Sequence, residues 1–185
     1  MKKVCLTVAI IALLAISCSK PQARRSISHS EGTFMKESVE RNKKLIKNEE
    51  QQIDSIIKSN PAVKYVASAK GYWYHYITEN KTDTITPKRG DVAYFTYDVK
   101  DIKGNVIYSE AELQPQVYHV DKQNIMMGIS DGIKLMNEGE KVTFIFPSHM
   151  GYSYHGDNDR IGTNQPLICT VTLNDIKPET EVKEN

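Results

Sequence analysis

Cysteine is scarce in this chain of 185 residues, which holds only Cys5, Cys18 and Cys169. Three unevenly spaced cysteines are too few for a disulfide scaffold. A charge excess is also absent, because 24 basic residues face 23 acidic ones, and this balance argues against nucleic-acid binding. Seven prolines and ten glycines are too few for a disordered or collagen-like chain. We therefore expect one ordinary domain with a packed core, plus appendages.

Several common catalytic motifs are missing too. We find no Walker loop, no H-E-x-x-H and no C-x-x-C, and we expect no nucleophile elbow, so acyl transfer, nucleotide hydrolysis and zinc catalysis are expected to lack their usual residues. One segment, residues 149–159, carries four side chains that could ligate a metal: His149, His155, Asp157 and Asp159. Because the same residue types are ordinary turn formers, we expect a loop there, with no metal and no cofactor.

The N-terminus has the pattern of a secretory signal peptide. Two lysines precede an apolar run from Val4 to Ile16, which small residues follow. As a helix of about 1.5 Å per residue, this run spans roughly 20 Å, which is less than a hydrocarbon core of ~30 Å. Cleavage is therefore favoured over a permanent membrane span. Residues 14–18, Leu-Ala-Ile-Ser-Cys, resemble a bacterial lipobox, in which Cys18 would carry the lipid; an ordinary signal peptide with an incidental Cys18 is the alternative.

These signals predict an envelope protein held by lipid. Removal of a signal peptide of residues 1–17 would leave 22 basic and 23 acidic residues, so membrane attachment would depend on the acyl chains and not on charge. Residues 18–33 are polar and are expected to form a flexible tether. The domain would then lie in the cell envelope and face the periplasm, with Cys169 as the one thiol of its folded part.

A polar helix is predicted within residues 34–70. Thr33 is a candidate N-cap and Pro61 the expected stop. The apolar residues recur at mostly helical spacing: Met35, Val39, Leu45, Ile46, Ile53, Ile56 and Ile57. Such a thin apolar stripe fits a spacer or a helix packed on its own domain. Dimerisation or partner docking through residues 35–60 is the alternative.

Residues 71–176 show strand-like patterns that one helix interrupts. The expected strands cover residues 72–78, 92–99, 105–109, 116–120, 141–146 and 167–173. The helix is expected over residues 127–137, with Ile129, Ile133 and Met136 on one face. Residues 177–185 form a polar tail. The order of elements indicates an α+β fold, in which an antiparallel sheet packs against one short helix.

Several blocks of this region resemble the FKBP-type peptidyl-prolyl isomerase family. The similar blocks are Pro87–Val92, the strand that ends in Tyr97, the turn at Gly104, Gly128–Lys141, Phe146–Tyr152 and Ile161–Leu173. Their order and spacing cover about residues 71–176. The lipobox, the tether and the preceding helix further resemble the lipoproteins of this family that are associated with gliding motility in Bacteroidota (GldI-like). The resemblance implies a curved antiparallel sheet that wraps one short helix and leaves an apolar cleft for X-Pro segments.

By position, the resemblance implies a set of cleft residues. Tyr97 would form a cleft wall, Ile129 the floor and Ile161 the rim, while the hydroxyl of Tyr152 would bond the ligand. Ile125 and Met126 stand at the two apolar positions before the helix, and Cys169 stands where the closing strand usually has Phe. Plain core packing is the alternative for the apolar members. Met150, Tyr154 and His155 are expected in the loop over the cleft.

Three positions depart from the family pattern. Ile107 replaces a usual Phe, Tyr108 replaces the Asp of the Phe-Asp-Ser segment, and Gln116 replaces an aromatic residue. The resemblance and the lipobox together imply a lipid-anchored isomerase that acts on X-Pro segments of exported or outer-membrane proteins. The alternative is an FKBP-fold chaperone or assembly subunit without significant turnover, which the missing Asp favours. A metal-dependent envelope protein is a third and weaker hypothesis.

Overall fold

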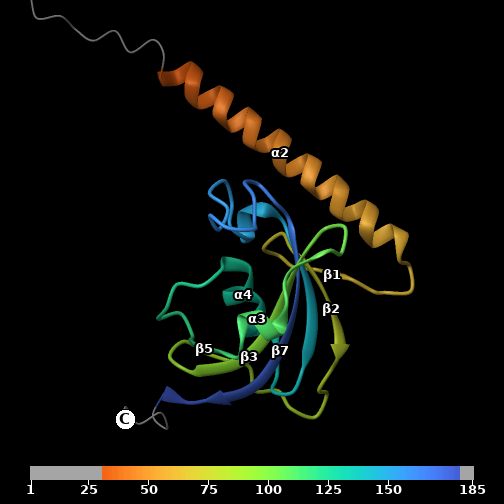
Figure 1. Ribbon diagram of the computed structural model, residues 1–185, viewed down its shortest axis with the longest axis vertical. Helices are drawn as coiled ribbons and strands as arrows, with labels where there is room; N and C mark the ends of the chain where they lie inside the picture. The colour runs from red at the N-terminus through yellow and green to blue at the C-terminus, as the bar shows by residue number, and fades with distance from the viewer. Residues whose placement is uncertain (1–30, 180–185) are drawn as a thin grey trace, which may run out of the picture. The chain divides into compact units, whose positions relative to one another are not determined.

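The computed structural model describes residues 31–179, which contain seven strands and several helical segments (Figure 1). The predicted signal peptide, Cys18, most of the tether and the last residues of the polar tail lie outside this range. The chain divides into two compact units, residues 1–40 and residues 41–185. None of the helices within the described range is both long and apolar enough to cross a bilayer.

The long N-terminal helix, α2, covers Glu31–Ser59. The prediction that Thr33 caps it was wrong, because the helix starts two residues earlier and Thr33 lies in its first turn. An acidic residue such as Glu31 is favoured at this end by the helix dipole. The helix ends two residues before Pro61, whose ring disfavours a helical conformation of the preceding residue. Only Glu49 and Ile53 of α2 are buried among the side chains from Thr33 onward.

All strands pair in antiparallel fashion in one sheet of order β1-β2-β6-β7-β3-β4, and β5 also pairs with β3. Their bounds are β1 Val66–Ala67, β2 Trp73–Thr78, β3 Val92–Asp101, β4 Val106–Tyr108, β5 Gln116–His119, β6 Lys141–Phe146 and β7 Leu167–Lys177. The prediction for β6 is confirmed at both ends. The central strands β3 and β7 run longer than predicted, because they pair from Val92↔Lys177 to Asp101↔Leu167 across a bulge after Tyr94.

The short helices differ from the sequence prediction in two ways. The expected helix over residues 127–137 is α4, Met127–Gly132, followed by a 3-10 turn, η1, at Ile133–Leu135. It ends early because Met136 takes an extended backbone with φ −99° and ψ 143°. The expectation of a single helix was wrong as well, since α3, Glu110–Leu113, and the 3-10 turn η2, Ser148–Met150, interrupt the strands.

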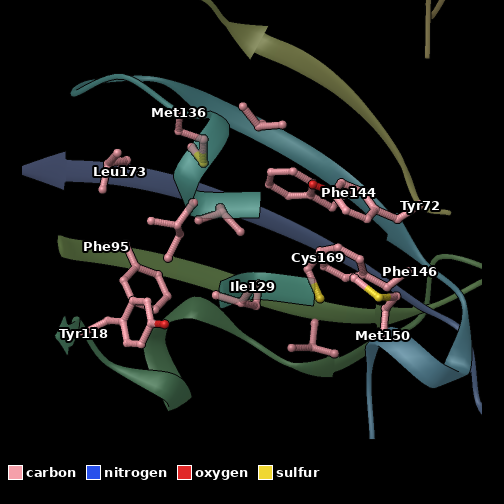
Figure 2. Close-up of a cluster of buried hydrophobic side chains, with 14 of the residues drawn as sticks. Tyr72, Phe95, Tyr118, Ile129, Met136, Phe144, Phe146, Met150, Cys169 and Leu173 are labelled. Atoms are coloured by element: carbon pink, nitrogen blue, oxygen red, sulfur yellow. The ribbon is translucent and has the colours of Figure 1, made fainter. Parts of the chain in front are cut away.

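Helix α4 packs on the core face of β6. Two glycines of this helix, Gly128 and Gly132, lie against the rings of Phe146 and Phe144, so closely that an added Cβ would stand 2.6 Å and 2.8 Å from ring atoms. Those two rings are stacked at 5.4 Å. Figure 2 shows the apolar cluster between helix and sheet. The three residues predicted for the helix face, Ile129, Ile133 and Met136, are all buried, although only Ile129 lies within α4 itself. The fold is thus α+β, as expected.

Candidate functional site

All nine residues that the resemblance places in the cleft lie in or against one apolar cluster. They come from β3, β4, the segment before α4, α4 itself, the loop between η2 and β7, and β7. Three are buried within the cluster: Ile129, Ile161 and Cys169. Six are partly exposed and pack against it: Tyr97, Ile107, Tyr108, Ile125, Met126 and Tyr152. The surface that a ligand could reach is therefore made by the second group.

The strand register places Tyr97 of β3, the expected cleft wall, next to β7. Tyr97 pairs with Val171, and Cys169 pairs with Val99, so Tyr97 and Cys169 share the core face, because residues two apart lie on one face of a strand. Figure 2 shows Cys169 near Phe146 and Met150 in the same cluster. Burial raises the pKa of the Cys169 thiol. A thiol that stays protonated is a packing group and not a nucleophile.

Two tyrosine hydroxyls of the cluster remain open to a ligand. Burial raises the pKa of Tyr97 to about 12, and the nearby Tyr152 and Cys169 add to the effect. Burial also raises the pKa of Tyr152, with Asp157 and Cys169 contributing. Neither hydroxyl has a hydrogen-bond partner among residues 31–179. Both groups are thus protonated donors at neutral pH, and a half-buried tyrosine hydroxyl without a protein partner can bond a ligand carbonyl.

Tyr108 stands where the family usually has Asp, and its hydroxyl is hydrogen-bonded to two carboxylates of a loop that is distant in the sequence. Its hydroxyl donates to Asp157 at 2.5 Å and to Asp159 at 3.1 Å. The guanidinium of Arg160 lies 4.5 Å from the centre of the Tyr108 ring and pairs with Glu112 of α3 at 3.0 Å. The carboxylate that is missing from β4 is therefore replaced in space by the loop after η2. Nearly fifty residues separate the partners, and no sequence signal pointed to this network.

The pKa values in this network follow from its hydrogen bonds. The bond to Asp157 and burial raise the pKa of Tyr108 to about 12. Burial alone would raise the pKa of Asp157, but the bonds from the Tyr108 hydroxyl and from the backbone N–H groups of Asp159 and Ile161 outweigh it, and the pKa is lowered. Asp157 is thus a charged acceptor that holds the loop against β4.

The loop of residues 149–159 was the one metal candidate, and its side chains are used differently. Both histidines are exposed, and the ring of His155 lies 3.8 Å from that of Tyr154. Asp157 and Asp159 accept from Tyr108. No three His, Cys, Asp or Glu side chains within residues 31–179 are grouped so that they could hold a metal ion. Met150 was expected in the loop over the cleft, but it lies in the core and is only 4 % exposed. Gln116, at a position where the family usually has an aromatic residue, donates a hydrogen bond from its side-chain amide to the carbonyl of Leu113.

The prediction that no nucleophile-elbow pattern is present was wrong at the level of letters, because residues 128–132, Gly-Ile-Ser-Asp-Gly, match G-x-S-x-G. That motif works when its serine sits on a sharp turn between a strand and a helix. Here Ser130 lies inside α4, and its hydroxyl shares a hydrogen bond of 2.7 Å with the buried Tyr118. The serine therefore fixes α4 to β5 and is not presented as a nucleophile.

An antiparallel sheet that packs on the short helix α4, with a tyrosine-bearing apolar cluster where neither Cys169 nor Ser130 is available as a nucleophile, defines a protein of the FKBP-like α+β class. A sequence profile of the FKBP-type peptidyl-prolyl cis-trans isomerase family matches residues 83–174. Human peptidyl-prolyl cis-trans isomerase FKBP2 is 30% identical over 99 residues, which are 53% of this chain and 70% of that protein. The chain belongs to the FKBP-type peptidyl-prolyl cis-trans isomerase family.

Bacterial relatives extend the match toward the N-terminus. A probable FKBP-type peptidyl-prolyl cis-trans isomerase, FkpA, of Neisseria meningitidis is 29% identical over 140 residues, 74% of this chain and 49% of that protein. The chain thus spans about half the length of this curated relative. The crystal structure of FkpA from Escherichia coli has the same fold, with a TM-score of 0.60 and 21% identity over 97% of this chain and 84% of that one.

Proposed function

We propose that this protein catalyses the cis-trans isomerisation of X-Pro bonds in exported polypeptides. The observation that carries the proposal is the pair of tyrosine hydroxyls of Tyr97 and Tyr152, which lie at one apolar cluster and have no hydrogen-bond partner among residues 31–179. Membership of the FKBP-type family supports the reaction class. The partly exposed apolar residues beside them, Ile107, Ile125 and Met126, would contact the proline ring.

Isomerisation of an X-Pro bond requires no catalytic nucleophile or cofactor from the protein. An X-Pro amide rotates slowly because twisting its C–N bond breaks resonance, with a barrier of roughly 18–20 kcal/mol. The twisted amide is less polar than the planar one, so an apolar surface that removes water from the carbonyl favours the transition state. A tyrosine hydroxyl can hold the substrate backbone during the rotation. No covalent intermediate is needed, which agrees with the protonated Cys169 and the bonded Ser130.

The test is a proline-limited refolding assay with the purified chain and a Tyr152→Phe variant. We expect wild type to accelerate the slow refolding phase, and Tyr152→Phe to lower kcat/KM about three- to tenfold, the value of one neutral hydrogen bond. Tyr94→Phe is the matched control, because Tyr94 of β3 lies outside the apolar cluster and contacts Lys177. An unchanged slow phase with folded wild type would reject the isomerase proposal.

One observation favours a second function, that of an FKBP-fold chaperone or assembly subunit with little turnover. Tyr108 occupies the position of the usual Asp, and the loop carboxylates that replace it are held by Tyr108 and Ile161. In that case the same cluster would bind proline-containing segments without accelerating their isomerisation. Peptide binding to wild type without any change in the slow refolding phase is the result that would distinguish this function.

We further propose that the protein is a lipoprotein of the cell envelope that assists the folding or assembly of exported proteins. Components of a gliding machinery are the most specific clients that we propose. The support is the lipobox-like sequence before Cys18 and the resemblance to gliding-associated lipoproteins. Incorporation of labelled palmitate by wild-type cells and its loss in Cys18→Ser would support the anchor; equal labelling would reject it.

Dimerisation through residues 35–60 also stays a prediction. The sedimentation coefficient of the purified chain tests it, because a dimer sediments faster than a monomer.

A further inference from the structure

Glu49 is an unusual residue of α2, because it is a buried acidic side chain on an otherwise solvated charged surface. It is 2 % exposed, whereas the other charged side chains of α2 from Lys36 to Lys58 are exposed. Taking a carboxylate out of water is costly unless hydrogen bonds replace its hydration. The hydrogen-bond donors that offset the desolvation of Glu49 therefore identify the segment that this helix holds in place.

Those partners both belong to Ser148, the first residue of η2. The backbone N–H of Ser148 donates to Oε2 of Glu49 at 2.9 Å, and its hydroxyl donates to Oε1 at 2.7 Å. Ser148 is itself only 3 % exposed. Each carboxylate oxygen thus accepts one bond from the same residue, 99 positions away in the chain. This pairing fixes the position of Ser148 on α2 in both direction and distance.

Ser148 in turn holds the segment that carries Tyr152. Its carbonyl oxygen accepts hydrogen bonds from the N–H of Gly151 at 3.0 Å and from the N–H of Ser153 at 2.8 Å. These two donors stand immediately before and after Tyr152. The carboxylate of Glu49 is therefore connected through Ser148 to the N–H groups of Gly151 and Ser153, the two residues that flank Tyr152.

We infer that Glu49 is a positioning residue for Tyr152 and that α2 is part of the isomerase site's support. The inference rests on the proposed function of Tyr152. Without Glu49, two buried donors of Ser148 lose their acceptor, and the turn that sets the Tyr152 hydroxyl is free to shift. A displacement of about 1 Å at a binding group is enough to cost up to a hundredfold in rate, although Glu49 itself does not touch the substrate.

Conservative replacement separates hydrogen bonding from packing. In Glu49→Gln the amide oxygen can accept from the N–H of Ser148 and the amide nitrogen can donate to its hydroxyl, so both bonds survive. Glu49→Ala removes both. Glu50→Ala is the matched control, because Glu50 is the adjacent glutamate of α2 and is exposed. If Glu49→Ala does not fold, Ser148→Ala replaces it, because that change removes only the hydroxyl bond.

The first measurement is amide hydrogen exchange at Gly151 and Ser153 in the full chain, which needs no activity. We expect faster exchange at both amides in Glu49→Ala, and near wild-type exchange in Glu49→Gln and in Glu50→Ala. Unchanged exchange at both amides in Glu49→Ala would overturn the inference. A wild type without isomerase activity would reject the proposed function instead, and the exchange result would still decide whether Glu49 positions this segment.

The second measurement is kcat/KM in the proline-limited refolding assay, in two backgrounds. We expect Glu49→Ala to lower kcat/KM about tenfold in the wild-type background. In the Tyr152→Phe background the same change should cost clearly less, because the hydroxyl that Glu49 positions is already absent. Equal fold-changes in the two backgrounds would show that Glu49 acts through stability alone and would overturn the inference.

Discussion

At the scale of single residues, the site shows why a local sequence pattern can predict a position but not its partners. The order of blocks placed Tyr97, Ile129 and Tyr152 at one cluster, and the structure brings them there. The replacement of the usual Asp by Tyr108 suggested a missing carboxylate. In the structure, the carboxylates of Asp157 and Asp159 lie beside this position and accept hydrogen bonds from the Tyr108 hydroxyl. Pairing between residues so far apart depends on how the loop folds back, which no linear spacing encodes.

Glu112 of α3 provides a prediction on pH dependence. Hydrogen bonds from the backbone N–H and the hydroxyl of Ser109, together with the guanidinium of Arg160, lower the pKa of Glu112 from 4.5 to about 2. A carboxyl whose pKa is lowered in the folded state stabilises that state above its unfolded pKa and loses this contribution as pH falls through the folded pKa. Glu112 should therefore stabilise the fold fully above about pH 5, and lose that effect between about pH 4.5 and 2.

The measurement is the melting temperature of wild type and Glu112→Gln as a function of pH. The difference between the two should be largest near neutral pH and should vanish as the pH approaches 2. Glu110→Gln is the control, since the side chain of Glu110 makes no hydrogen bond within residues 31–179. A constant difference between wild type and Glu112→Gln across this range would contradict the prediction.

At the scale of elements, the strands were easier to predict than the helical segments. The β-branched and aromatic run of residues 141–146 predicted β6 correctly at both ends, because this signal lies within the strand itself. The helix expected over residues 127–137 was shorter in the structure, since Met136 turns into an extended conformation to reach the core. Helix α3 was not predicted, although Ser109 and Glu112 form a capping box, a signal that is readable in a sequence.

The contact between α4 and β6 provides a second prediction. Gly128→Ala would place a Cβ 2.6 Å from the ring of Phe146, which is closer than atoms can pack. Alanine gains about 1 kcal/mol of helix propensity over glycine, but overpacking a core costs about 1–3 kcal/mol. Because Phe146 is fully buried and stacked on Phe144, it cannot move away freely. The variant should be less stable by about 1–2 kcal/mol.

Thermal unfolding measures this effect, and a loss of about 1 kcal/mol lowers the melting temperature by roughly 2–4 °C in a chain of this size. Met127→Ala is a suitable control, because Met127 is the neighbouring residue of α4 and is 59 % exposed. Its melting temperature should stay within about 1 °C of wild type, since exposed substitutions change stability little. A Gly128→Ala protein as stable as wild type would show that the helix can shift away from β6.

At the scale of the whole molecule, the chain from Arg41 onward behaves as one compact unit that includes most of α2. The sequence left open whether this helix is a spacer or packs on its own domain. Its residue Ile53 has no exposed surface, and a helix cannot bury one of its own side chains completely without other segments covering it. Together with the Glu49–Ser148 bonds, this burial supports packing on its own domain for the C-terminal half of α2.

This arrangement predicts that α2 and the sheet unfold together. Trp73 of β2 is the only tryptophan of the chain, so its fluorescence reports the sheet, while far-ultraviolet circular dichroism reports mainly the 29-residue α2. Coincident transitions by the two probes are the mark of one cooperative unit. Ile53→Ala should destabilise the protein by about 2–5 kcal/mol, the cost of a cavity at a buried aliphatic side chain. Both probes should shift to the same lower midpoint.

The control is Val39→Ala, because Val39 lies on the same helix but is 47 % exposed, and its midpoint should match that of wild type. An independent spacer would give the opposite behaviour. The dichroism signal would then melt separately from the Trp73 fluorescence, and Ile53→Ala would change only the first of the two transitions. Because Glu49 can hold Ser148 only while α2 stays docked, such separate melting would also mean that the helix leaves the Tyr152 segment before the sheet unfolds.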